Sequence, residues 1–155
     1  MNQVIASMPF GDALELSVCV DASLVVKWLV SEADSTEALT VLERLIHGST
    51  QMVAPYLIDY EVASVLRRIA ARGEVAVDEA LARVALLEML PIRRLHSPFL
   101  LRRTWEIASR YGLPTVYDAC YVALAEITGA RLYTCDEALI SALGGKSDLI
   151  VNPMR

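Results

Sequence analysis

The sequence has few cysteines and no long uninterrupted hydrophobic run, and each of these shortages excludes a class of protein. Its three cysteines, Cys19, Cys120 and Cys135, are odd in number and widely spaced, which excludes a disulfide framework and a paired-cysteine metal site. We expect three buried thiols. No apolar stretch approaches the roughly 18 residues of a membrane-spanning helix. The chain begins without a basic segment ahead of a small-residue cleavage site, so we expect a cytoplasmic protein.

Hydrophobic residues are abundant instead. They make up 55% of the 155 residues, and the mean hydropathy is +0.42, which is high for a chain whose length fits about one domain. We attribute the surplus to apolar surface that is buried against a partner protein or a second copy of the chain.

The charge distribution is uneven along the chain. A net charge of −5 argues against a protein that coats nucleic acid generally, because phosphate binding is mainly electrostatic. Residues 61–110, however, contain nine arginines and six acids. Twelve of the fourteen basic residues are arginine, whose forked guanidinium suits phosphate or carboxylate. Any single arginine is still more often part of a solvated helix face.

Short apolar runs alternate with longer segments of helical period, which predicts an α/β fold with a mostly parallel sheet. The predicted strands are 17–20, 52–54, 92–95, 131–135 and 149–151. The predicted helices are a first from about 23, then 34–47, 55–71, 77–90 and 98–110, one from 114, and a short one after 136. We expect residues 17–155 to form one domain, preceded by a flexible extension over residues 1–16.

Four acids stand where open parallel sheets gather functional groups, beyond the carboxyl ends of the strands. Asp21 and Asp136 directly follow predicted strands, whereas Glu61 and Asp118 lie in early turns of long predicted helices. Each acid alone has an ordinary explanation as a helix cap or as a charge at the positive end of a helix dipole.

As a set, the four acids point to a metal ion. Two carboxylates about 5 Å apart repel by roughly 3 kcal/mol at an effective dielectric near 20, and a divalent cation turns that repulsion into attraction. Oxygen ligands without histidine or cysteine suit Mg²⁺ or Mn²⁺ rather than zinc. Such an ion can hold a phosphodiester and activate an attacking water.

The four acids lie in stretches that read VDASLVVKWL (20–29), APYLIDYEVASVLRR (54–68), LPTVYDACYVALAE (113–126) and LYTCDEAL (132–139). In this order and spacing the stretches resemble the PIN-domain ribonucleases, and within them the VapC-type toxins of bacterial toxin–antitoxin pairs. The resemblance spans nearly all of the chain from Ser17 onward. Members of the family generally begin one or two residues before the first strand, whereas sixteen residues precede it here.

The resemblance implies a three-layer sandwich, with a parallel sheet between helices, and a metal-dependent endoribonuclease activity. It implies that Mg²⁺ or Mn²⁺ is held by Asp21, Glu61, Asp118 and Asp136. Ser23 and Thr134 are implied to support the site as hydroxyls that bond to the acids or to metal-bound water. Toxins of this family usually form homodimers, and a cognate antitoxin inhibits them by covering the acidic pocket with its C-terminal segment. We expect hydrolysis of RNA to leave a 5′-phosphate and a 3′-hydroxyl.

Several further residues have two interpretations. Candidate RNA contacts are Arg67, Arg68, Arg72, Arg93, Arg94, Arg102 and Arg103. Tyr117 and Tyr121 flank Asp118 and either stack on a base or pack in the core. The segment 144–147 ends like a phosphate-binding loop but lacks that motif's earlier glycine, so we interpret it as a turn.

Three other functions remain to be weighed. A phosphatase of the haloacid-dehalogenase type is set aside because it needs a second Asp where Ser23 stands. A phosphoacceptor receiver domain is set aside because it needs an acidic pair at the first strand and a late strand-end lysine, and neither is found here. The stronger alternative is a catalytically inactive PIN-like binding module. Loss of one acid would indicate that module, and all four acids are present.

Overall fold

Five strands pair in parallel into one sheet in the computed structural model, which describes residues 17–31, 34–144 and 148–155. The strands are β1 (Ser17–Val20), β2 (Gln51–Pro55), β3 (Ile92–Leu95), β4 (Arg131–Tyr133) and β5 (Ile150–Val151). Their order is β3-β2-β1-β4-β5, so β1 lies at the centre. Every described strand pair is parallel, which confirms the predicted sheet. The predicted extension over residues 1–16 and most of the predicted turn, residues 145–147, lie outside the described residues.

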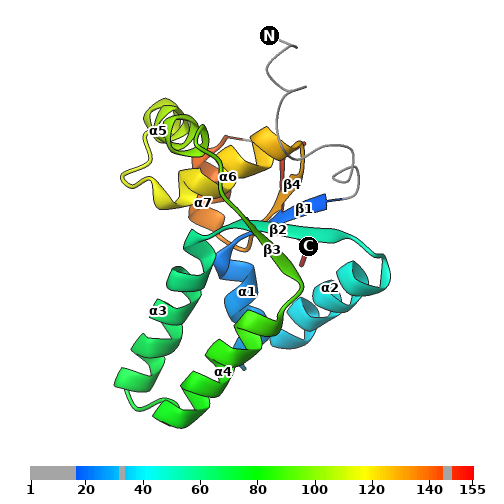
Figure 1. Ribbon diagram of the computed structural model, residues 1–155, viewed down its shortest axis with the longest axis vertical. Helices are drawn as coiled ribbons and strands as arrows, with labels where there is room; N and C mark the ends of the chain where they lie inside the picture. Colours follow the sequence, from blue (N-terminus) through cyan, green and yellow to red (C-terminus); the bar gives the residue numbers. More distant parts are fainter. Residues whose placement is uncertain (1–16, 32–33, 145–147) are drawn as a thin grey trace.

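Helices cover both faces of the sheet. They are α1 (Ala22–Leu29), α2 (Ser35–His47), α3 (Leu57–Ala71), α4 (Val77–Met89), α5 (Leu100–Tyr111), α6 (Tyr117–Thr128) and α7 (Glu137–Ala142). Figure 1 shows α5 and α6 on one side of the sheet and α1 to α4 on the other. The three-layer sandwich is therefore confirmed.

Packing of helices on both faces of the sheet explains why the central strand β1 is one continuous apolar run. Val18, Cys19 and Val20 are all buried, as expected for a strand with helices against both faces. Leu66 of α3 and Leu124 of α6, from the two helical layers, have no exposed surface. Burying a side chain of this size contributes roughly 1.5–3 kcal/mol, so the two layers are held to the sheet mainly by apolar contact.

Three helices begin two or three residues later than their prolines suggested, and one strand ends earlier. Pro55 is the last residue of β2, where it pairs with Leu95, and α3 begins only at Leu57. Likewise α5 begins at Leu100 rather than at residue 98, and α6 at Tyr117 rather than at residue 114. A proline fixes φ near −65°, which suits a turn or strand end as well as a first helical turn. The strand predicted to reach residue 135 ends at 133: the amide of Thr134 still bonds to the carbonyl of Val151 in β5, but the amide of Cys135 bonds to the hydroxyl of Ser23 instead of to a strand.

The prediction of three buried thiols was right only for the first. Cys19 has no exposed surface, whereas Cys120 and Cys135 are partly exposed, and all three are free. Burial raises the pKa of the Cys19 thiol. None of the helices in the described part of the chain combines the length and the apolar character that a bilayer crossing requires.

Candidate active site

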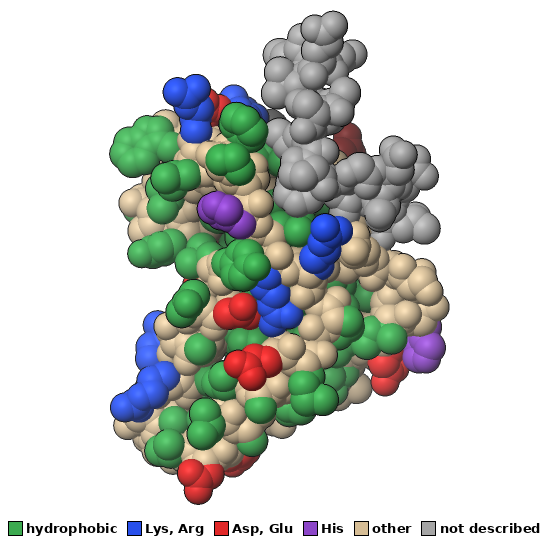
Figure 2. All heavy atoms as spheres, viewed as in Figure 1, with side chains coloured by type: hydrophobic (Ala, Val, Ile, Leu, Met, Phe, Trp, Pro, Cys, Tyr) green, Lys and Arg blue, Asp and Glu red, His purple; other side chains and the backbone are tan. Residues whose placement is uncertain are grey.

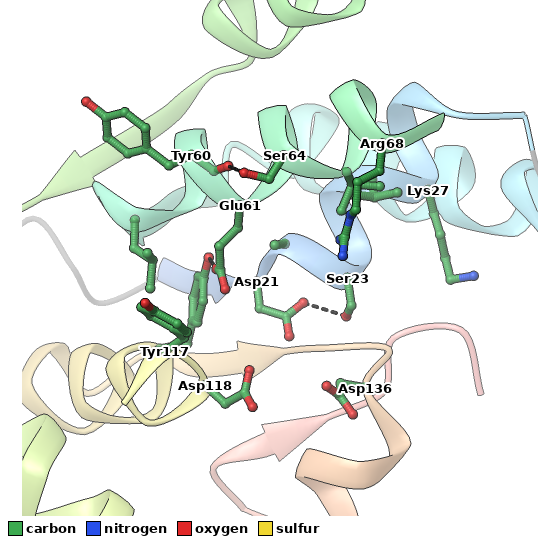
Figure 3. Close-up of a pocket in the computed structure, with 15 residues that line it drawn as sticks. Asp21, Ser23, Lys27, Tyr60, Glu61, Ser64, Arg68, Tyr117, Asp118 and Asp136 are labelled. Atoms are coloured by element: carbon green, nitrogen blue, oxygen red, sulfur yellow. Dashed lines mark hydrogen bonds between the residues drawn. The ribbon is translucent and has the colours of Figure 1, made fainter. Parts of the chain in front are cut away.

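The four predicted acids all line one pocket at the carboxyl edge of the sheet, and its volume is about 750 Å³ (Figure 3). Asp21 follows β1 and Asp136 follows β4, and these two strands are neighbours in the sheet. Glu61 comes from α3 on one side and Asp118 from the first turn of α6 on the other. Residues far apart in sequence are thus brought together by the parallel topology.

Asp21 lies deepest and is the most constrained of the four. Its side chain accepts hydrogen bonds from the Ser23 hydroxyl at 2.6 Å, the Thr134 hydroxyl at 2.5 Å and the Leu24 amide at 3.2 Å. Only 5% of Asp21 is exposed, and burial raises its pKa to about 6 although all three hydrogen bonds lower it. The nearby charge of Asp136 raises the pKa of Asp21 further.

The two predicted supporting hydroxyls also tie neighbouring elements together. Ser23 accepts from the amide of Cys135 at 2.9 Å, and Thr134 accepts from the amide of Asp136 at 2.9 Å. These bonds use the backbone amides that follow β4, which explains why that strand ends early. They also fix the segment with Asp136 against the carboxylate of Asp21.

Glu61 has a partner that the sequence did not reveal. The hydroxyl of Tyr121 donates to the Glu61 carboxylate, and Tyr121 is only 2% exposed. Burial raises the pKa of Glu61, as do the charges of Asp118 and Asp21, whereas the bond from Tyr121 lowers it. Tyr121 therefore packs in the core, as one of its two interpretations held, but its polar end holds a carboxylate of the site. Its position one turn after Asp118 on α6 was the available signal.

Asp136 combines a structural contact with its place in the pocket. Asp136 caps α7, accepting from the amides of Ala138 at 2.8 Å and Leu139 at 3.0 Å. Asp21 caps α1 in the same way through the Leu24 amide. Asp118 is partly buried, and its pKa is raised by that burial and by the charge of Asp136. The helix-cap interpretation therefore holds for Asp21 and Asp136 beside their place in the pocket.

The donor set fits a hard divalent cation. All four side chains offer carboxylate oxygens, and three of them have a raised pKa to which a neighbouring carboxylate contributes. Within the described ranges, no three acidic, thiol or imidazole side chains converge into a ready-made cage. Mg²⁺ does not need such a cage, because it keeps several waters and binds through one or two carboxylates together with substrate phosphates.

Two cationic side chains, Lys27 and Arg68, line the same pocket. The Lys27 ammonium binds both carboxylate oxygens of Asp34, at 2.9 and 2.8 Å. Arg68 is exposed and pairs with no acid among the described residues. Of the seven arginines predicted to contact RNA, only Arg68 lines the pocket.

Three of the other candidate arginines are used in ion pairs. Arg94 donates to Asp59 at 2.9 Å and to three backbone carbonyls that end or follow α4. Arg103 bonds to Glu126 at 2.5 Å and to Glu106. On the surface, Arg72 forms an ion pair with Glu74, which follows α3. Arg67, Arg93 and Arg102 are exposed outside the pocket.

Comparisons with known proteins agree on one family. A model described as the PIN domain matches residues 18–145. Ribonuclease VapC1 of Mycobacterium tuberculosis is 38% identical over 126 residues, which are 81% of this chain and 90% of that protein. Ribonuclease VapC3 of Pyrobaculum aerophilum is 36% identical over 126 residues, or 80% of this chain and 92% of that protein.

Two crystal structures share the fold. One is PAE2754 from Pyrobaculum aerophilum, with a TM-score of 0.65 and 24% identity over 87% of this chain and 83% of that one. The other is Mycobacterium tuberculosis VapC20, described as a sarcin–ricin loop cleaving toxin, with a TM-score of 0.62 and 21% identity over 82% of this chain and 95% of that one.

Proposed function

The chain belongs to the PIN-domain family, among its VapC ribonucleases, and from this premise we propose that it is a toxin endoribonuclease that hydrolyses RNA at the acidic pocket. We assign residues 17–155 to one PIN domain. The observation that carries the proposal is that four carboxylates from separate segments line one pocket, and that neighbouring carboxylates help to raise the pKa values of three of them, Asp21, Glu61 and Asp118. An inactive binding module has no need to maintain so costly a group of charges.

The pocket would hold Mg²⁺ or Mn²⁺ through Asp21, Glu61, Asp118 and Asp136. When bound, such an ion polarises the phosphodiester and lowers the pKa of an attacking water. The carboxylates must be ionised to bind a cation. Because burial raises the pKa of Asp21 to about 6, we expect binding to weaken below that pH.

The protein's own groups orient the acids. Ser23 and Thr134 each donate to Asp21, so its carboxylate faces the pocket in one orientation. Tyr121 does the same for Glu61. Neutral hydroxyl donors suit this task, since they fix a carboxylate without neutralising the charge that a cation requires.

Attack by water would leave a 5′-phosphate and a 3′-hydroxyl. Attack by the 2′-hydroxyl of the RNA would instead leave a 2′,3′-cyclic phosphate. No histidine is among the described residues that line the pocket, so the proton transfers of that second route lack their usual group. We therefore propose hydrolysis by water, with the acidic side chains as the groups that orient it.

Exposed arginines are the proposed contacts to the rest of the RNA. Arg67, Arg68 and Arg72 lie in the last turns of α3 and just beyond it, and Figure 2 shows basic side chains along that edge of the molecule. Arg93 and Arg102 are exposed elsewhere. We leave Arg94 and Arg103 out, because their guanidinium groups are bound to acids and their side chains are only 14% and 31% exposed, whereas the side chain of Arg72 is 62% exposed despite its ion pair.

We propose two protein partners, a cognate antitoxin and a second copy of the chain, and we place the activity in the cytoplasm, where RNA and antitoxin are made. Exposed apolar side chains support these contacts, and Figure 2 shows such side chains over α5 and at the α3–α4 end. They include Leu81, Leu86 and Met89 of α4, and Leu101 and Trp105 of α5. Their exposure accounts for part of the high mean hydropathy.

The test is cleavage of total cellular RNA by the purified chain in EDTA, Mg²⁺ or Mn²⁺, with products captured by a ligation that requires a 5′-phosphate. We expect metal-dependent products for the wild type and a loss of at least about 100-fold for Asp118→Asn. Asp78→Asn is the matched control, because Asp78 is an exposed acid on α4 outside the pocket. Cleavage in EDTA, or products with a 2′,3′-cyclic phosphate, would contradict the proposed chemistry.

A further inference from the structure

Asp136 stands at the start of a helix that has little contact of its own with the core. Its side chain lies in the pocket (Figure 3), and the helix it caps, α7, buries only one of its six residues, Leu139. The amides of Ala138 and Leu139 both donate to the same carboxylate oxygen, Oδ1. Among the described residues no hydrogen bond reaches the other oxygen, Oδ2. The place of that oxygen therefore depends on how the start of α7 is held.

Two hydroxyls hold this start from the side of the pocket. Ser23 accepts from the amide of Cys135, and Thr134 accepts from the amide of Asp136. Both bonds act on the backbone just before the helix. The side chains of Cys135 and Glu137, the two neighbours of Asp136 in the chain, are left to other partners.

Those partners are in residues 152–155, which follow β5 and which we call the post-β5 segment. The Asn152 amide nitrogen Nδ2 donates to Oε1 of Glu137 at 3.0 Å. The Met154 sulfur lies 3.3 Å from the sulfur of Cys135. Arg155 also pairs with Glu137, at 3.1 Å, but its side chain is 72% exposed, and an ion pair so open to solvent contributes little. Asn152 and Met154 therefore make the contacts that matter.

The post-β5 segment is itself fixed in one shape. Oδ1 of Asn152 accepts from the amide of Met154 at 3.1 Å, so a single side chain both closes this turn and binds Glu137. The guanidinium of Arg44 on α2 donates to the carbonyl of Pro153 at 3.3 Å. Asn152, Pro153 and Met154 are all half-buried. The segment thus connects α2 with the first turn of α7.

We propose that Asn152 and Met154 are positioning residues for the metal site, which hold the two neighbours of Asp136 and thereby place its Oδ2 oxygen in the pocket. The inference rests on the proposed ribonuclease function and adds two residues that do not line the pocket. A carboxylate that is already in place binds an ion without first having to be ordered. Loss of either contact should therefore weaken cation binding although every ligand is still present.

The test is a Mn²⁺ titration of the wild type, Asn152→Ala and Met154→Ala, followed by electron paramagnetic resonance without RNA. Because both side chains act through a neighbour of the ligand, we expect a loss of about 3- to 10-fold in affinity, less than for a direct partner of a ligand. Neither substitution changes the net charge, so weaker long-range attraction for the cation cannot cause the loss. Met154→Leu keeps an apolar side chain of similar size and should restore most of the affinity.

A matched control and a measurement of stability separate positioning from a general loss of structure. Thr40→Ala removes a hydrogen bond within α2, from the Thr40 hydroxyl to the carbonyl of Thr36 at 3.0 Å, far from the residues that line the pocket in sequence and outside their number. It should bind Mn²⁺ like the wild type. Urea unfolding of each protein shows whether it is folded. A purely structural role for Asn152 would lower stability while the folded protein kept its affinity for Mn²⁺.

A double-mutant cycle shows whether the effect passes through Asp136. In Asp136→Asn there is no carboxylate at that position to be placed, so adding Asn152→Ala should weaken Mn²⁺ binding by less than about twofold. The same should hold when Met154→Ala is added.

Two results would overturn the inference. One is wild-type affinity for Mn²⁺ in Asn152→Ala or in Met154→Ala, which would leave the proposed function standing. The other is an equal loss of affinity with and without the Asp136 carboxylate, which would make the post-β5 segment a general support of the pocket. If the wild type itself takes up no Mn²⁺, the metal site of the proposed function fails, and the inference fails with it because there is no site to position.

Discussion

Asp21→Asn should change how the stability of the metal-free protein depends on pH. The pKa of Asp21 is raised to about 6 from an ordinary value of 3.8, chiefly by burial. The folded state therefore binds the proton more tightly than the unfolded state does. The contribution of Asp21 to stability is fully present below about pH 3.8 and is lost as the pH rises through about 6.

The size of the effect follows from that shift. A difference of about two pKa units corresponds to about 3 kcal/mol of unfolding free energy. Asn mimics the protonated acid at every pH, and its amide oxygen can still accept from Ser23 and Leu24. The wild type should therefore lose about 3 kcal/mol relative to Asp21→Asn between about pH 4 and pH 7.

The assay is urea unfolding of both proteins in EDTA over this pH range. Asp34→Asn provides a control of opposite sign, because the hydrogen bond and charge of Lys27 lower the pKa of Asp34. The wild type should gain stability relative to that control as pH rises. An unchanging difference between the wild type and Asp21→Asn, or one that moves in the opposite direction, would refute the argument that a buried carboxylate is held at a cost.

Three further changes test individual contacts. Tyr121→Phe removes a hydrogen bond that lowers the pKa of Glu61. The acidic limb of the pH profile of kcat/KM should therefore move to higher pH, and an unchanged limb would show that the bond does not serve the site. Thr134→Val leaves one oxygen of Asp21 without its donor and should cost about 1–3 kcal/mol in chemical denaturation, with Thr134→Ser restoring most of it. Arg94→Met should cost about 2–3 kcal/mol of unfolding free energy yet leave kcat/KM of the folded protein unchanged, and a selective loss of cleavage would return this arginine to the RNA contacts.

The parallel sheet and the location of the acids could be predicted from the sequence because both follow from local pattern. A buried apolar run identified β1, and β4 was identified although Leu132 alone of its three residues is buried. Residues just beyond parallel strands meet at one edge of a sheet. Asp21 and Asp136 therefore had to be close once their strands were neighbours. The first residues of the helices were predicted less accurately, since a proline such as Pro55 fits the end of a strand as well as the start of a helix.

Contacts between distant helices could not be predicted in the same way. The bond from Tyr121 to Glu61 joins α6 to α3, and it depends on how each helix is rotated about its axis. The two arginines of β3 show the same limit. Arg93 is exposed while Arg94 turns to Asp59, because successive residues of a strand face opposite sides and the sequence does not say which side is covered.

The central claim is that the acidic pocket holds a divalent ion, and the most direct measurement is a Mn²⁺ titration followed by electron paramagnetic resonance, without RNA. We expect the wild type and Asp78→Asn to bind Mn²⁺ with equal affinity. We expect Asp118→Asn to bind it at least about tenfold more weakly, since the Asp118 side chain lines the pocket and has a raised pKa. Equal affinity for all three proteins would show that the acidic pocket does not hold the ion.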